Sequence, residues 1–311
     1  MAQVSGRTEP THDRADLTRF AWLSIAAALA TIGLKTAAYL LTGSVGLLSD
    51  AAESIANLAG ASMALAMLII AARPADKSHS YGHSKAEYFS SGVEGLLVLV
   101  AAAGIIWSSA DHLLHPHPLE QLGLGLLISA AASLINLAVA RILMRAGKRE
   151  NSITLEADAQ HLMTDVWTSV GIIGGVGIVA LTGWNALDPL VAIFVALNII
   201  WTGVQMVRRS VAGLMDAALP ANEQQIIENV MANYRGKQVD FHALRTRQAA
   251  SRRFVTVHML VPGSWTVHAA HRFAEDFESD IRAALGEAVI TTHVEPIEDE
   301  LSMQDIRLEQ E

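Results

Sequence analysis

The sequence contains no cysteine among its 311 residues. Disulfide bonds and thiolate metal ligands are therefore excluded, so any metal site must use histidine, aspartate, glutamate, asparagine or backbone oxygen. Twelve histidines are present, and they are the first candidates for metal ligands.

Charge is scarce as well. Only 17% of the residues are charged, whereas 51% are hydrophobic and the mean hydropathy is +0.33. This composition is too apolar for an ordinary soluble domain and predicts a membrane protein. The polar segment 1–16 lacks a short apolar core followed by a cleavage site, so we expect no removable signal peptide.

Six apolar stretches are each long enough to cross the ~30 Å hydrocarbon core as a helix. They span residues 18–41, 46–72, 88–111, 120–143, 153–181 and 187–208. We therefore predict three parts: an N-terminal tail (1–16), a six-helix transmembrane domain (17–211) and a C-terminal domain in water (212–311).

Lysine and arginine are absent from three of the five connections between these stretches. The other two connections and both flanks carry them, as at Arg14, Arg73, Arg145 and Arg208. Because positive residues stay on the cytoplasmic side, both termini should face the cytoplasm. The second and fifth stretches then cross the membrane in opposite directions.

The pattern changes near Asp216 to that of a soluble α+β domain. Its expected elements are a helix (Asn222–Tyr234), two strands (Gln238–Gln248, Arg253–Val261), a helix (Thr266–Leu285) and a strand (Ala288–Glu295). The predicted fold class is thus an all-α six-helix membrane domain followed by an αββαβ domain, like a ferredoxin or a metallochaperone.

Residues 216–311 include 16 acidic and 9 basic side chains, so they carry −7 of the net charge of −9. This excess of negative charge argues against nucleic-acid binding. It suits a surface that collects cations, although a merely soluble acidic domain explains the charge equally well.

Two of the apolar stretches carry a pair of polar residues four positions apart. Glu53 and Asn57 lie in the second, and His161 and Asp165 in the fifth. Residues four apart share a helix face, and ionisable groups at this depth are costly and indicate function. Because the two stretches are antiparallel, Glu53 matches Asp165 in depth. Asn57 likewise matches His161.

These four side chains offer oxygen and nitrogen ligands around one point, which suits a four-coordinate ion such as Zn²⁺. Two carboxylates, a neutral imidazole and an amide would balance a divalent cation. Protons could replace the metal on His161 and a carboxylate, which gives a physical basis for metal–proton exchange. The alternative is that the four side chains only hold neighbouring helices together.

Other polar residues of the apolar stretches have less defined roles. Asp158, one turn before His161, either guides ions in from the cytoplasm or orients His161 as a hydrogen-bond acceptor. Glu94 and Asn136 are expected to form hydrogen bonds between helices. We interpret three histidines on the outer side as parts of an interfacial turn rather than of a release site: His112, His115 and His117.

Several short motifs are spread over nearly the whole chain. They are Ser44-Val-Gly-Leu-Leu-Ser-Asp-Ala51, Ser80-Tyr-Gly-His-Ser-Lys-Ala-Glu87, His161-xxx-Asp165, Leu214-Met-Asp216 and Leu244-Arg-Thr-Arg-Gln248. Together they resemble the cation diffusion facilitator family, specifically its bacterial six-span zinc/iron exporter branch. The resemblance implies a homodimer that exports divalent metal by alternating access against inward protons.

The resemblance places the family's transport site on Glu53, Asn57, His161 and Asp165. The family commonly has His or Asp in span two, followed four residues later by Asp, whereas this chain has Glu53 and Asn57. An amide in place of a carboxylate removes a negative charge, so metal preference stays open among Zn²⁺, Fe²⁺, Co²⁺, Cd²⁺ and Mn²⁺. Affinity order alone favours Zn²⁺ over Fe²⁺ and Mn²⁺.

The resemblance also implies two metal sites outside the bilayer. One lies in the loop between spans two and three, where the side chains could also be simply solvated: Asp76, His79 and His83. The other is a regulatory cluster in the cytoplasmic domain, with a glutamate where the family often has aspartate: His242, His258, His271, His293 and Glu295. Lys85 and Asp216 match a family ion pair proposed to lock the dimer.

We therefore expect a proton-coupled exporter of divalent metal, Zn²⁺ first, in the inner membrane. It should be a transporter and not an enzyme, because no nucleophile–base pair accompanies the metal ligands. Its partners would be a second copy of the chain, the lipid bilayer and protons. The alternative is a membrane-anchored metal sensor that signals through its cytoplasmic domain and would not need the intramembrane carboxylates.

Overall fold

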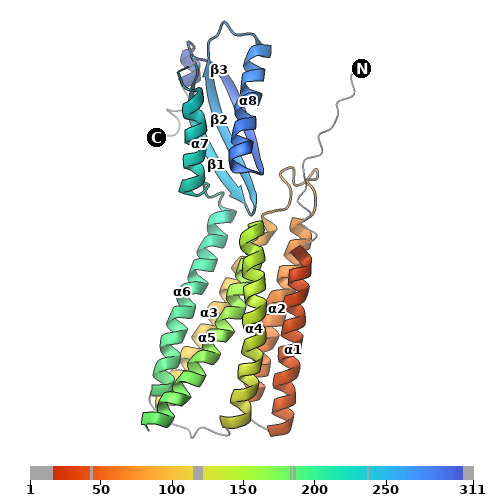
Figure 1. Cartoon of the computed structure of the whole chain (residues 1–311), viewed down its shortest axis with the longest axis vertical. Helices are drawn as coiled ribbons and strands as arrows, with labels where there is room; N and C mark the ends of the chain where they lie inside the picture. Colours follow the sequence, from red (N-terminus) through yellow and green to blue (C-terminus); the bar gives the residue numbers. More distant parts are fainter. Residues whose placement is uncertain are drawn as a thin grey trace. The chain divides into compact units, whose positions relative to one another are not determined.

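The chain divides into two compact units, Met1–Val211 and Ala212–Glu311. A computed structural model describes residues 17–42, 45–114, 122–182, 184, 187–236 and 238–303. Each unit is described by itself below, and Figure 1 labels the helices and strands of both.

The first unit is built from long helices that lie side by side (Figure 1). Its described residues form α1 (Thr18–Thr42), α2 (Val45–Ala71), α3 (Ala86–Leu114), α4 (Leu122–Glu150), α5 (Ile153–Thr182) and α6 (Leu187–Leu214). The helices cover the six predicted stretches and begin or end a few residues from the expected bounds.

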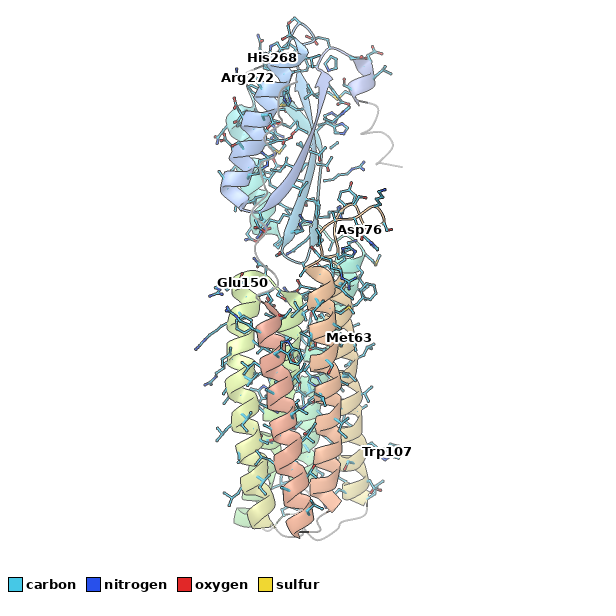
Figure 2. All side chains as sticks on the ribbon, turned by 90° about the vertical axis from the view of Figure 1, so that its right-hand side faces the viewer. Met63, Asp76, Trp107, Glu150, His268 and Arg272 are labelled. Atoms are coloured by element: carbon cyan, nitrogen blue, oxygen red, sulfur yellow. The ribbon has the colours of Figure 1, made fainter. Side chains whose placement is uncertain are left out.

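Hydropathy separates these helices into two groups. Helices α1, α3, α4 and α6 contain segments long and apolar enough to cross a membrane. In α2 the apolar segment found among the described residues is only Asn57–Ala71, and α5 carries both Asp158 and Asp165. Many large apolar side chains are exposed, such as Trp107, which projects from α3 in Figure 2. A lipid environment would cover such side chains, as expected for a multi-pass membrane protein.

Small residues let the helices approach closely. Ala21, Ala61 and Ala140 are almost fully buried between helices. At Gly203 of α6 a β-carbon would lie 2.9 Å from Cγ of Leu99 and 3.2 Å from the carbonyl oxygen of Gly95, so α3 and α6 meet where a side chain is missing. Close packing of this kind is the usual basis of helix association in membranes.

The second unit contains a sheet with the strand order β1–β2–β3. Its elements are α7 (Ala221–Tyr234), β1 (Asp240–Ala249), β2 (Arg252–Val261), α8 (Val267–Leu285), β3 (Ala288–Pro296) and a final 3₁₀ turn (Glu300–Met303). Strands β1 and β2 pair antiparallel, whereas β2 and β3 pair parallel across α8. The predicted fold class is confirmed: a helical membrane region precedes an αββαβ domain.

The core of the second unit lies between the helices and one face of the sheet. Val255, Val257 and Met259 of β2 are buried in one cluster with Phe277 and Ile281 of α8. Because side chains alternate along a strand, the even-numbered residues of β2 point to the opposite face. The register of the sheet therefore decides which polar residues gather away from the helices.

Candidate metal sites

The predicted membrane site forms where α2 meets α5. The His161 ring lies against the side chain of Asn57, with 2.7 Å between Nε2 and Oδ1. The amide nitrogen of Asn57 donates a hydrogen bond to Oδ2 of Asp165. The antiparallel helices thus bring Asn57 and His161 together, as the depth match predicted.

A third helix contributes Asn136, which lies on α4 and is buried. Its amide nitrogen donates to the same Oδ2 of Asp165, at 3.0 Å. Asp165 therefore accepts two hydrogen bonds from neutral amides, which fix the position of its carboxylate.

Two buried atoms of this cluster have no hydrogen-bond partner among the described residues: Nδ1 of His161 and Oδ1 of Asn136. An imidazole that donates to Asn57 through Nε2 keeps the lone pair on Nδ1, which is the form that binds metal. Buried polar atoms are nearly always satisfied by some partner. The donor set therefore fits a cation coordinated by nitrogen and oxygen.

The fourth predicted ligand, Glu53, lies on α2, one turn before Asn57. Its side chain is outside the described part of the structure. Metal binding by Glu53, Asn57, His161 and Asp165 together thus remains a prediction.

Sequence reasoning placed Asn136 between helices without assigning it to this site. Asn136 has no ionisable residue one helical turn away, so its spacing in the sequence does not indicate a site. Asp158 accepts a hydrogen bond from Ser24 at 3.0 Å, and no contact with His161 is recorded within the described ranges. Glu94 accepts a hydrogen bond within its own helix, from Ser90 at 3.2 Å, and not between helices as expected.

The loop between α2 and α3 brings its three predicted ligands together. The ligand atoms of Asp76, His79 and His83 lie within 4.8 Å of one another. Nδ1 of His79 and Nε2 of His83 are each 3.4 Å from an oxygen of Asp76. Asp76, labelled in Figure 2, is exposed.

The local backbone fixes the carboxylate of Asp76. The backbone N–H groups of Ser78 and His79 donate to its Oδ1 at 2.8 and 2.7 Å. The bond from His79 is the main cause that lowers the pKa of Asp76 below its ordinary value. The group thus stays ionised, as a cation ligand must, further into the acidic range.

In the cytoplasmic domain, the sheet register aligns three histidines in a row. His242 pairs with His258 across β1 and β2, and His258 pairs with His293 across β2 and β3. Paired residues point to the same face, so the rings lie next to one another with centroids 5.0 and 4.9 Å apart, the first pair edge to face and the second tilted. We call these three residues and Glu295 the histidine row.

Glu295 lies two residues after His293 on the same face of β3. Its Oε2 is 2.8 Å from Nε2 of His242 and 3.3 Å from Nδ1 of His258. Its Oε1 is 3.4 Å from Nε2 of His293. One carboxylate therefore contacts all three rings, and the ligand atoms of His242, His258 and Glu295 are close enough to share one ion.

His271 does not join this row within one chain. It is exposed on α8, whose buried face packs on the opposite side of the sheet, so the expectation that the fold brings it to the other four is not met. Figure 2 labels two further residues of the same helix, His268 and Arg272, which are also exposed. A ligand role for His271 remains a prediction.

The predicted ion pair joins residues of different units. Asp216 accepts a hydrogen bond from Arg247 at 3.1 Å within the second unit. Lys85 belongs to the first unit, and its pairing with Asp216 stays a prediction. Of the outer histidines, His112 lies in the last turn of α3, whereas His115 and His117 are outside the described residues.

Comparison with known proteins covers nearly the whole chain. Residues 21–215 match the family described as the cation efflux transmembrane domain. Residues 219–297 match the cytoplasmic domain of cation efflux proteins. The two matches meet close to the boundary between the compact units.

Individual relatives match over similar lengths. An uncharacterized transporter of Synechocystis sp. is 52% identical over 92% of this chain and 92% of its own. A cation-efflux pump, FieF, of Shewanella oneidensis is 28% identical over 90% of this chain and 94% of its own. FieF of Escherichia coli O127:H6 is 27% identical over 90% and 93%. A solved structure of a putative zinc transporter, CzrB, in its zinc form covers 25% of this chain and 90% of its own, at 34% identity and a TM-score of 0.24.

Proposed function

The chain belongs to the cation efflux family, and we propose that it exports divalent metal ions from the cytoplasm in exchange for protons. The observation that carries this proposal is the buried cluster of Asn57, Asn136, His161 and Asp165 inside the helical bundle. Burying polar and ionisable side chains within a bilayer costs free energy, so such a cluster indicates a function such as ion binding.

Asp165, His161 and Asn57 would hold the metal, through a carboxylate oxygen, an imidazole nitrogen and an amide oxygen. Asn57 contacts both of them and so fixes their spacing, while Asn136 orients the carboxylate. Glu53 would supply the second carboxylate, which makes the occupied site neutral overall. We propose Zn²⁺ as the first substrate, with Fe²⁺, Co²⁺, Cd²⁺ and Mn²⁺ also admissible, because imidazole together with oxygen ligands suits all of them.

Proton coupling follows from the same charge balance. When the metal leaves, carboxylates buried in an apolar bundle cannot stay ionised without cost. Protons on the carboxylates and on His161 would replace the lost charge, so that each empty carrier returns with protons. Alternating access of the site to the two sides of the membrane would complete the cycle.

The remaining parts of the proposal concern assembly and place. We infer a homodimer in the inner membrane with both termini in the cytoplasm, because the second unit matches the cytoplasmic domain of the family and the Lys/Arg bias is one-sided. The histidine row and the loop site would then both face the compartment from which metal is taken.

The test is metal uptake by proteoliposomes under an imposed pH gradient. Wild-type protein should transport Zn²⁺ at a rate that rises with the opposing proton gradient. Asp165→Asn and His161→Ala should remove this uptake, whereas Glu150→Gln, at the end of α4, should retain it. Equal uptake by all four proteins would contradict the proposal.

A membrane-anchored metal sensor is the second candidate, and the histidine row is the observation that favours it. A sensor would bind metal through the row without moving metal through the bundle. Zn²⁺ binding by the full-length protein together with no uptake in liposomes would support this reading.

A further inference from the structure

A second pair of acidic residues, Glu94 of α3 and Asp158 of α5, is buried within the bundle, at 0% and 2% exposure. Asp158 precedes His161 by three residues, which is about 4.5 Å along the helix axis. Gly60 of α2 lies against Glu94, since a β-carbon built there would be 3.8 Å from Cγ of Glu94. Both carboxyl groups therefore lie one turn from the predicted transport site.

Both carboxyl groups are displaced from the predicted transport site toward the same end of the bundle. Gly60 follows Asn57 by three residues, and α2 runs antiparallel to α5. Moving from Asn57 to Gly60 and from His161 to Asp158 thus leads toward the same end of the bundle. By the Lys/Arg bias of the connections, this end faces the cytoplasm.

Each carboxyl group is held by one oxygen and leaves the other without a partner. The hydroxyl of Ser90 donates to Oε1 of Glu94 at 3.2 Å, and that of Ser24 donates to Oδ1 of Asp158 at 3.0 Å. Oε2 of Glu94 and Oδ2 of Asp158 are buried and have no hydrogen-bond partner in the described part of the chain. Helices α3 and α5 pack against each other, so the two carboxyl groups belong to neighbouring helices.

No basic side chain among the described residues pairs with either carboxyl group. Two carboxylates in an apolar bundle need a compensating charge, because an isolated buried charge is strongly unfavourable. A divalent cation between the free oxygens would neutralise both groups at once. Two carboxylates with two nearby hydroxyls make an oxygen-only donor set, which suits hard ions such as Mn²⁺.

We propose that Glu94 and Asp158 form a second divalent-cation site, which receives the ion from the cytoplasm one helical turn before His161. Its place on the route rests on the proposed export function, whereas the binding itself does not. The oxygen-only donor set would hold the ion more loosely than the site that includes His161, so the ion would pass onward.

The test is the number of Mn²⁺ ions bound by the full-length protein in detergent, counted by electron paramagnetic resonance. Glu94→Gln and Asp158→Asn keep the hydrogen bonds from Ser90 and Ser24 while removing the charge. The double variant should bind one Mn²⁺ fewer per protomer than the wild type. Each single variant should lower the affinity for that Mn²⁺ ion by at least about tenfold. The single variants also provide the test if the double variant does not fold.

Glu156→Gln is the matched control, because Glu156 lies on the same helix but pairs with Arg209. It removes the same charge and should leave the count unchanged. If the number of bound Mn²⁺ ions is unchanged in the double variant and in both single variants, the inference is overturned. Glu94 and Asp158 would then be a pair of protonated carboxyl groups.

Uptake of Zn²⁺ by wild type and Asp165→Asn, measured in parallel, separates the two proposals. Uptake that depends on Asp165, together with an unchanged Mn²⁺ count, would overturn only the second site. A lost Mn²⁺ ion in a protein without any uptake would overturn only export.

Discussion

The cluster of Asn57, Asn136, His161 and Asp165 in the bundle and the histidine row on the sheet use similar side chains in opposite surroundings. His161 is 4% exposed and lies among helices, whereas the side chain of His293 is 62% exposed at the end of the row. The first cluster combines one histidine with a carboxylate and two amides. The second combines three histidines with one carboxylate.

This difference in burial determines what can replace a metal ion when it leaves its ligands. If the row binds a metal ion, as proposed, water can replace that ion at little cost, because the end of the row is exposed. In the bundle the ligands are buried, so protons or a rearrangement must compensate for the loss of the ion. The buried cluster is thus suited to exchange, and the row to regulation.

The largest effect is expected from Asp165→Asn. This change removes a charged ligand at the centre of the buried cluster, so Zn²⁺ uptake should fall by about 100-fold or more. The row would be untouched, and metal binding to the full-length protein should persist. Radiometric uptake and equilibrium dialysis on the same preparation measure both quantities. Loss of binding to the row as well would remove the distinction between the two clusters.

A smaller effect is expected from Asn136→Leu, which deletes a donor to Asp165 but no proposed ligand. Loss of such supporting hydrogen bonds typically costs about 10-fold or more in metal affinity. The concentration of Zn²⁺ that gives half-maximal uptake should rise accordingly. Leu134→Ala, an exposed position on the same helix, is the control. An unchanged half-maximal concentration would show that Asn136 only packs the bundle.

Asn57→Asp should alter metal preference more than rate. A carboxylate in place of the amide adds a negative charge and a hard oxygen ligand. The ratio of Mn²⁺ uptake to Zn²⁺ uptake should therefore rise by about tenfold, which corresponds to the free energy of one charged hydrogen bond. Competition between the two metals in an uptake assay gives the ratio directly. An unaltered ratio would place Asn57 outside the ligand set.

His258→Ala should empty the row but change transport little. His258 stands between the other two rings and also contacts Glu295, so its loss breaks the cluster at its centre. Uptake at saturating Zn²⁺ should change by less than about threefold, because the metal ligands in the bundle stay intact. A complete loss of uptake would make the row part of the transport path.

The smallest effect concerns pH at the loop site. Because the pKa of Asp76 is lowered, its stabilising charge is present above its ordinary range and is lost only as pH falls through the lowered value. Between pH 7 and 5 the ionisation of Asp76 should therefore not change. Asp76→Asn should weaken Zn²⁺ binding at the loop without altering its dependence on pH over this range, as measured by calorimetry. A changed dependence would show that Asp76 itself titrates there.

The spacing of residues along single elements predicted most of what the structure contains. The four-residue interval between His161 and Asp165 predicted a shared helix face, and the opposite direction of the two stretches predicted the contact with Asn57. The grouping of His242 with His258 came from the family resemblance, and the pairing of β1 with β2 brings the two residues together.

Sequence reasoning failed where a contact depends on how separate elements pack. Asn136 reaches Asp165 from another helix, and nothing in α4 indicates which of its faces meets α5. His271 was grouped with the row through the family resemblance, yet α8 covers the other face of the sheet. Glu94 and Asp158 lie on two helices that pack against each other, α3 and α5, and no periodicity reveals that packing.

The exchange of metal against protons in the buried cluster is tested most directly by proton movement that a metal gradient drives. Vesicles containing wild-type protein and a pH-sensitive dye, with Zn²⁺ added on one side only, should show protons moving opposite to the metal. Asp165→Asn vesicles should show no such movement. Zn²⁺ entry without proton movement in wild-type vesicles, or equal proton movement in both, would contradict exchange at this cluster.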